Sequence, residues 1–126
     1  MNSTLTSKTS RLGLRGEEAA AHYLEKQGLK VVGKHFQTRW GEIDLVCREH
    51  DAWVFVEVKT RTRASEPGAL EAMTSAKQKR LVMAALSYLK KHGLKGQGLR
   101  FDVVAIEAGR IQWIPGAFEP AQQYTY

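Results

Sequence analysis

The stretch Trp53-Val54-Phe55-Val56-Glu57-Val58-Lys59-Thr60 decides the fold, because its β-branched and aromatic composition is that of a buried strand. It nevertheless carries a carboxylate and an ammonium group. Side chains two residues apart in a strand point to the same face, so we expect Glu57 and Lys59 to lie side by side. Burying both charges is costly unless a metal ion, a phosphate or a partner charge offsets them. The stretch therefore predicts a functional site within a sheet.

A second acidic residue lies in the apolar segment that precedes this strand. Asp44 stands in the run 41–46, and twelve residues separate it from Glu57. We expect strands over 42–48 and 53–60, joined by a hairpin turn at 49–51. Two antiparallel strands that each carry an acid predict a cation site, because Mg²⁺ prefers carboxylate oxygens. The spacing leaves one alternative open, a Glu57–Lys59 pair in a buried or edge strand with Asp44 near solvent.

The rest of the chain alternates helical and strand patterns. A helix is predicted from Ser10 to Gly28, and a second one is capped by Thr74 or Ser75 and closed by Gly93. Further strands are predicted over 29–36, 100–106 and 110–114, with a long irregular connection at 61–73. The order α-β-β-β-α-β-β predicts an α/β fold in which helices flank a mixed central sheet. We expect a disordered N-terminus (1–9), one domain (10–115) and an irregular C-terminal tail (116–126).

Composition narrows the class of function. The 126 residues carry a net charge of +6, which favours a polyanionic partner such as nucleic acid. No apolar run approaches the length of about 20 residues that a membrane-spanning helix needs. The single cysteine, Cys47, excludes an internal disulfide and a cysteine-based zinc site. Residence in the cytoplasm is the expectation, with no membrane partner.

Several blocks in order resemble a known family. The segments 41–46 and 57–59 resemble the Asp…(Asp/Glu)-x-Lys motif of the restriction-endonuclease-like nuclease superfamily. More narrowly, the chain resembles the YraN-like family of small bacterial proteins within that fold. The blocks that carry the resemblance are Gly16-Glu17 with Ala20 and Tyr23-Leu24, Arg39-x-Gly41-Glu42-Ile43-Asp44-Leu45-Val46, Phe55-Val56-Glu57-Val58-Lys59-Thr60-Arg61, Lys77, and Arg100-Phe101-Asp102-Val103-Val104.

The resemblance implies roles for individual residues. Asp44 and Glu57 would be metal ligands and Lys59 the catalytic lysine, and Glu17 matches the first-helix acid that junction resolvases of the superfamily place near the metal. The carbonyl of Val58 is expected at the same strand edge, where it would add a third oxygen ligand. Gln78 is followed four residues later by Val82 and not by tyrosine. This departure weakens an exonuclease interpretation.

The expected function is a Mg²⁺- or Mn²⁺-dependent DNA endonuclease that hydrolyses phosphodiester bonds, acting on branched or repair intermediates and selecting structure rather than sequence. Two alternatives are a non-catalytic nucleic-acid-binding protein and an adaptor that retains the nuclease fold. A homodimer would let so small a domain span a duplex. Phosphate contacts are expected from basic residues near the acids, each of which is otherwise a solvated surface cation: Arg39, Arg61, Arg63, Lys77, Lys79 and Arg80. Trp40 is the best placed aromatic for base stacking. Glu42 and Asp102 are expected to be a solvated and a structural acid, and the four histidines show no ligand spacing.

Overall fold

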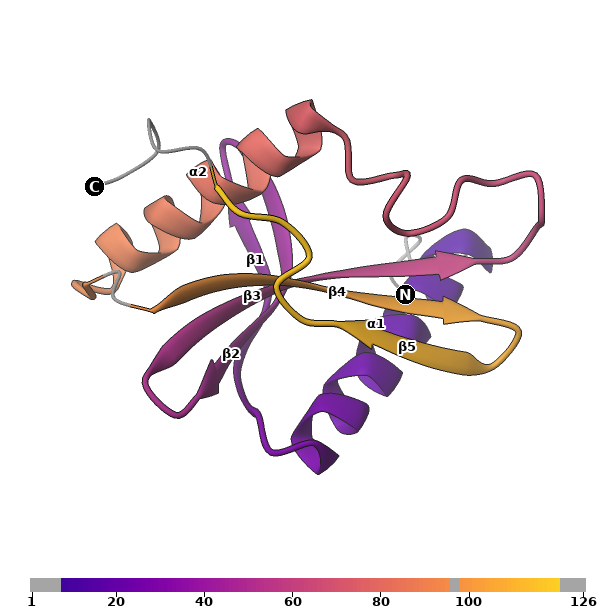
Figure 1. Cartoon of the computed structure of the whole chain (residues 1–126), viewed down its shortest axis with the longest axis horizontal. Helices are drawn as coiled ribbons and strands as arrows, with labels where there is room; N and C mark the ends of the chain where they lie inside the picture. The colour runs from indigo at the N-terminus through magenta and orange to yellow at the C-terminus, as the bar shows by residue number, and fades with distance from the viewer. Residues whose placement is uncertain (1–7, 96–97, 121–126) are drawn as a thin grey trace, which may run out of the picture.

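The computed structural model describes residues 8–95 and 98–120, with side chains from Arg15 onward. The predicted order α-β-β-β-α-β-β and the mixed α/β class are confirmed (Figure 1). The elements are α1 (Lys8–Lys26), β1 (Lys30–Thr38), β2 (Gly41–Glu49), β3 (Ala52–Arg61), α2 (Ser75–Lys91), β4 (Leu99–Glu107) and β5 (Arg110–Ile114). The expectations for residues 1–7 and 121–126 lie outside the described residues. Helix α1 begins two residues before the predicted start.

The sheet has its five strands in chain order, β1-β2-β3-β4-β5. β1, β2 and β3 form an antiparallel meander, and β5 is a hairpin partner of β4. Only β3 and β4 run parallel among these pairs, and the connection between them contains α2. A parallel pair needs such a crossover, so the long segment after β3 follows from the topology. Figure 1 shows the two helices on opposite faces of the sheet.

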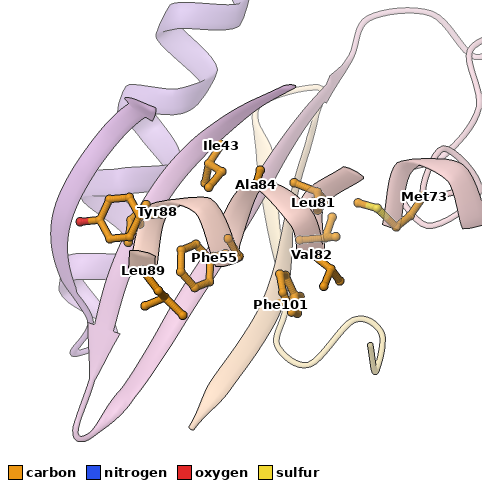
Figure 2. Close-up of a cluster of buried hydrophobic side chains, with 12 residues drawn as sticks. Ile43, Phe55, Met73, Leu81, Val82, Ala84, Tyr88, Leu89 and Phe101 are labelled. Carbon is orange, nitrogen blue, oxygen red and sulfur yellow. The ribbon is translucent and has the colours of Figure 1, made fainter. Parts of the chain in front are cut away.

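Each helix covers its own apolar core. Towards α2 lie Ile43, Phe55, Phe101 and Val103, packed under a stripe of helix side chains that includes Leu81 and Tyr88 (Figure 2). Towards α1 lie Leu45, Cys47, Val54, Val56 and Val104, packed against Ala20, Ala21 and Leu24. Helix α2 starts as predicted, with the Thr74 hydroxyl accepting the Lys77 N–H at 3.2 Å.

The alternation of β2 breaks at Asp44. Ile43 faces the α2 core, whereas Leu45, two residues later, faces the α1 core. Pairing with β3 begins only at Leu45↔Val56, so the earlier part of β2 diverges from β3. The divergence leaves a gap between the two strands, and Asp44 lies at its start.

Glycine sets the distance between α1 and β3. A methyl group at Gly16 would overlap the hydroxyl of Thr60, so only glycine lets the helix approach this closely. Gly16 is itself buried. The close approach matters because the next residue, Glu17, is thereby held against the sheet at the gap.

The connection after β3 and the start of the C-terminal tail are both held by specific bonds. The Glu66 carboxylate accepts bonds from the Thr62 N–H, the Thr62 hydroxyl and the Arg63 N–H. The tail turns back at Gly116, Ala117 N–H bonds the Phe101 carbonyl at 2.8 Å, and Phe118 stacks on Phe101 with ring centroids 5.0 Å apart. Packing therefore continues past the predicted domain end at 115.

Candidate functional site

Asp44 occupies the gap between β2 and β3. The residue is 8% exposed, and Oδ2 accepts the backbone N–H of Val58 at 2.8 Å. This bond takes the place of a ladder bond where the strands have separated. The N–H and C=O of one extended residue leave on the same side of a strand, so the Val58 carbonyl is directed into the same gap.

Burial raises the pKa of Asp44 to about 8, with the neighbouring Glu57 and Glu17 carboxylates adding to the rise. The Val58 N–H bond lowers it by a smaller amount. Burial also raises the pKa of Glu17, partly offset by His35. With a pKa of about 8, the carboxyl group of Asp44 retains its proton at neutral pH. The main cause is burial of the carboxyl group, and the neighbouring carboxylates add to it.

Glu17 reaches the cluster from α1. Its side chain is 15% exposed, and its carboxylate lies close enough to that of Asp44 for the two groups to shift each other's pKa. Two carboxylates in contact need either a shared proton or a cation between them. The structure thus brings together Glu17, which only family resemblance had indicated, and Asp44, which strand patterning had indicated.

Glu57 approaches the cluster from the other face of the sheet. Its side chain is 14% exposed, and Oε2 lies 3.0 Å from the ammonium nitrogen of Lys77 near the start of α2. Lys77, for which a phosphate contact is expected, forms an ion pair with a carboxylate in this structure. The topology allows the meeting, because the crossover after β3 leads into α2, which covers the face of the sheet that carries Phe55.

Lys59 is the next residue after Glu57 on the face of β3 that is covered by α2, and it lines a groove. The groove has a volume of about 270 Å³ and lies between the end of the sheet and residues 68–71 of the connection. Lys59, Arg61, Ala105 and Gln112 line its floor and side. The ammonium group of Lys59 forms no ion pair within 4.0 Å with any described carboxylate, in contrast to that of Lys77.

His35 and Glu42 also belong to the cluster. His35 Nδ1 lies 2.8 Å from Glu17 Oε1 and 3.8 Å from Glu42 Oε2. No spacing in the sequence indicated His35. The only signal was its position opposite Asp44 in a hairpin register, which needs the strand pairing to be known to within one residue.

The other basic residues have separate environments. Arg39 lies over the ring of Trp40 at 4.6 Å, and Trp40 shares a small cavity with Glu42, Lys77 and Arg80. Arg61 donates to the carbonyls of Arg63 and Ala64 and so holds the connection after β3. Arg63 is exposed, and Lys79 lies beside Phe118, away from the acids. Lys77 and Arg80 therefore share a cavity with Glu42 of the cluster, and Arg39 lies over Trp40 of that cavity. Lys59 and Arg61 line the separate groove.

Asp102 has the structural role expected of it. It is 2% exposed and accepts bonds from Arg100 Nε and Nη2, Trp113 Nε1 and the Gly116 N–H, at 2.8 to 2.9 Å. Every partner is a protein donor, so Asp102 closes the β4–β5 corner and is separate from the cluster.

The acid cluster fits a divalent cation. Its donors are hard carboxylate oxygens, which Mg²⁺ and Mn²⁺ prefer, together with one strand carbonyl directed at the same gap. A bound cation would replace the proton that Asp44 retains because of its raised pKa.

The described helices include none that combines the length and apolarity of a membrane span.

Two solved structures share a low similarity with the chain. One is Archaeoglobus fulgidus Hjc, a Holliday junction resolvase, with a TM-score of 0.47, 17% identity, and coverage of 86% of this chain and 82% of that one. The other is Pyrococcus furiosus SfsA in complex with Ca²⁺, with a TM-score of 0.41, 13% identity, and coverage of 86% and 65%. Their activities and ligands are properties of those proteins.

Sequence relatives are much closer. A UPF0102 protein of Shewanella sediminis is 42% identical over 106 residues, which cover 84% of this chain and 90% of that protein. A UPF0102 protein of Shewanella oneidensis is 48% identical over 107 residues, which cover 85% and 98%. The model of the uncharacterised protein family UPF0102 matches residues 16–106, a range that contains Glu17, Asp44, Glu57 and Lys59. The chain therefore belongs to the UPF0102 family.

Proposed function

We propose that the protein is a Mg²⁺- or Mn²⁺-dependent DNA endonuclease of the cytoplasm, acting on branched or repair intermediates. The observation that carries this proposal is the convergence of three carboxylates on the β2–β3 gap. Asp44 is buried there with a raised pKa, Glu17 touches it, and Glu57 is next but one to Lys59. Clustered carboxyl groups suit a bound cation, and the neighbouring lysine suits a phosphate.

Asp44, Glu57 and the Val58 carbonyl are the ligands that would hold the cation. A cation bound there would offset charge on a phosphate and lower the pKa of a water molecule. In the hydrolysis, the water oxygen bonds to phosphorus and the bridging P–O bond breaks. One fragment keeps a phosphate monoester and the other a hydroxyl group.

The protein's own groups would supply orientation and proton transfer. Lys59 stands two residues from Glu57 on the same face, where its ammonium can donate to the attacking water or to a phosphate oxygen. Glu17, already in contact with Asp44, would receive the proton released by the water. Lys77 now neutralises Glu57, and a cation at Glu57 would free this ammonium for the substrate phosphate.

The basic residues around the cluster support DNA as the substrate. Lys77 and Arg80 share a cavity with Glu42, Arg39 lies over Trp40 of that cavity, and Lys59 and Arg61 line the groove. They would contact phosphates, which carry no sequence information, so we propose selection by DNA structure. Arg63 and Lys79 would contact more distant phosphates. Cleaving two strands needs two sites, which a homodimer would provide.

The test is a cleavage assay on linear, flapped and four-way junction DNA with Mg²⁺ or Mn²⁺. We expect cleavage by the wild type and a loss of at least about 100-fold in Asp44→Asn and Lys59→Ala, since metal binding and charge stabilisation are removed. Lys90→Ala, which removes an exposed lysine at the far end of α2, is the matched control and should cleave normally.

Other outcomes of the cleavage assay would contradict the proposal or favour one of the two alternative functions. Cleavage that survives both substitutions contradicts the catalytic assignment. DNA binding without cleavage in any metal would identify a non-catalytic nucleic-acid-binding protein. Absence of binding to any DNA at low salt would leave the adaptor function.

A further inference from the structure

The geometry points to a second cation site, built by Glu17, His35 and Glu42, which we propose binds a divalent first-row transition ion through one nitrogen and two oxygens. One ligand atom from each side chain lies within 4.8 Å of the other two. The three residues come from α1, β1 and β2, so the tertiary fold assembles them. This site uses an imidazole and a glutamate that the proposed nuclease chemistry leaves without a role.

The spacing of the ligand atoms suits a shared ion. His35 Nδ1 lies 2.8 Å from Glu17 Oε1 and 3.8 Å from Glu42 Oε2. Ligands about 2.1 Å from a common metal stand roughly 3 to 4 Å from each other in octahedral or tetrahedral arrangements. The cluster therefore needs little rearrangement to hold an ion.

Glu17 Oε1 supplies an independent observation. This atom has no solvent-exposed surface and accepts no hydrogen bond, and no other buried side-chain nitrogen or oxygen in the described part of the chain is in that state. His35 Nδ1 is close to it, but the contact lacks the alignment of a hydrogen bond. A buried carboxylate oxygen facing an imidazole nitrogen without a hydrogen bond is an arrangement that a cation completes.

The backbone directs His35 into the cluster. His35 has φ of 52° in the middle of β1, whereas the other described non-glycine residues with positive φ, His50 and Ala108, lie in the turns after β2 and β4. The sheet register is also shifted between Val31 and Gly33, just before His35. A left-handed residue inside a strand departs from the regular alternation of side chains, and here the imidazole meets Glu17 and Glu42.

Glu42 is held in place by a neighbour. Gln37, its cross-strand partner, donates from Nε2 to Glu42 Oε2 at 2.6 Å. Outer hydrogen bonds of this kind orient metal-binding carboxylates. A nitrogen ligand with two carboxylates favours ions such as Mn²⁺ and Zn²⁺ over Mg²⁺, which prefers oxygen alone. The two sites would thus differ in the metal that each prefers, although Glu17 touches both.

The test is equilibrium dialysis of the full, tag-free chain against Zn²⁺ in excess Mg²⁺, comparing the wild type with His35→Asn. Asparagine tolerates a positive φ, so this variant removes the imidazole and preserves the backbone. We expect one Zn²⁺ per chain in the wild type and at least a tenfold loss of affinity in His35→Asn. His50→Asn is the matched control, since it makes the same change at another positive-φ histidine that is exposed in a turn, and it should bind Zn²⁺ normally.

Equal Zn²⁺ affinity in His35→Asn and the wild type would overturn the proposal, as would the absence of stoichiometric binding. If His35→Asn fails to fold, the wild type still decides: the pulsed EPR spectrum of bound Mn²⁺ should contain a ¹⁴N coupling from imidazole, and its absence contradicts the site. Both readouts measure occupancy, so a protein that cleaves no DNA can still pass them. A failure here likewise leaves the cleavage assay to be judged separately.

Discussion

Two aspartates are buried on strands that flank β3, and their surroundings are opposite. Asp102 on β4 accepts four hydrogen bonds, two of them from the guanidinium of Arg100. Asp44 on β2 accepts one, from the Val58 N–H, and its other neighbours include the carboxylates of Glu17 and Glu57. Burial alone therefore does not identify a functional acid. The balance of donors around the carboxylate does.

Asp102 is neutralised by protein groups, whereas Asp44 lies among other carboxyl groups. Arg100 also pairs with Glu49, so the β4 carboxylate belongs to a network that the protein neutralises by itself. In the acid cluster, Lys77 pairs with Glu57, and Asp44 forms no ion pair with a described basic side chain. The local excess of acid costs stability in the metal-free protein, a cost that functional sites commonly carry.

The largest expected effect is on Asp102→Asn. The amide would present a donor where four donors already converge, and Arg100 would lose one of its two partner charges. We expect a loss of about 3 kcal/mol in the free energy of unfolding, near the low end for a broken buried pair because Arg100 is 28% exposed. Urea denaturation measures it, with Asp51→Asn in the exposed turn after β2 as the control. A loss below about 1 kcal/mol would contradict a closed network.

Asp44→Asn should have the opposite sign. The amide can still accept the Val58 N–H and can donate to Glu17, which removes a carboxylate–carboxylate contact. We expect the metal-free variant to gain about 2 kcal/mol of stability at pH 8. Thermal and urea unfolding in EDTA measure this gain. Destabilisation by Asp44→Asn would break the comparison between the two aspartates.

The stability difference between Asp44→Asn and the wild type should depend on pH. The pKa of Asp44 is about 8 in the folded state against an ordinary value of 3.8. A raised carboxyl pKa contributes stability that is fully present below about pH 4 and is lost as pH rises through the folded pKa. The advantage of the variant should therefore be small at pH 4, grow towards pH 8, and then level off. A pH-independent difference in EDTA would show that Asp44 ionises normally.

A smaller effect is expected from Gly16→Ala, which tests whether the close approach of α1 to β3 positions Glu17 at the acid cluster. The added methyl group overlaps the Thr60 hydroxyl, so α1 must shift away from β3. We expect a loss of about 1 to 2 kcal/mol in the free energy of unfolding. Thr60→Ala removes the obstructing oxygen, and the double variant should recover most of the loss. Additive losses in the double variant would contradict this contact.

Much of the fold could be predicted from the sequence, because its signals are local. The strand at 53–60, the Thr74 cap and the hairpins are specified by nearby residues, and the structure confirms them to within one or two residues. The resemblance likewise placed Glu17 with the acids. The packing of the C-terminal segment could not be predicted from sequence, because Phe118 meets Phe101 after a turn without periodic pattern.

The parts of the site that sequence could not predict depend on irregular backbone and on tertiary placement. His35 joins the acids through a positive φ and a shifted register in β1, neither of which has a dependable sequence signature. Lys77 meets Glu57 only because the crossover after β3 returns α2 to the same face of the sheet. Conversely, the donors that neutralise Asp102 come from β4, β5 and Gly116, and strand patterning indicates no more than an arginine nearby.

The most direct test of the central claim is the effect of Mg²⁺ on unfolding of the wild type and of Asp44→Asn. A cation that binds only the folded state at 100 times its Kd adds about 2.7 kcal/mol of stability. We predict that saturating Mg²⁺ stabilises the wild type by about this amount at pH 8 and leaves Asp44→Asn unchanged. Equal responses in the two proteins, or no response in either, would contradict a divalent metal site at the β2–β3 gap.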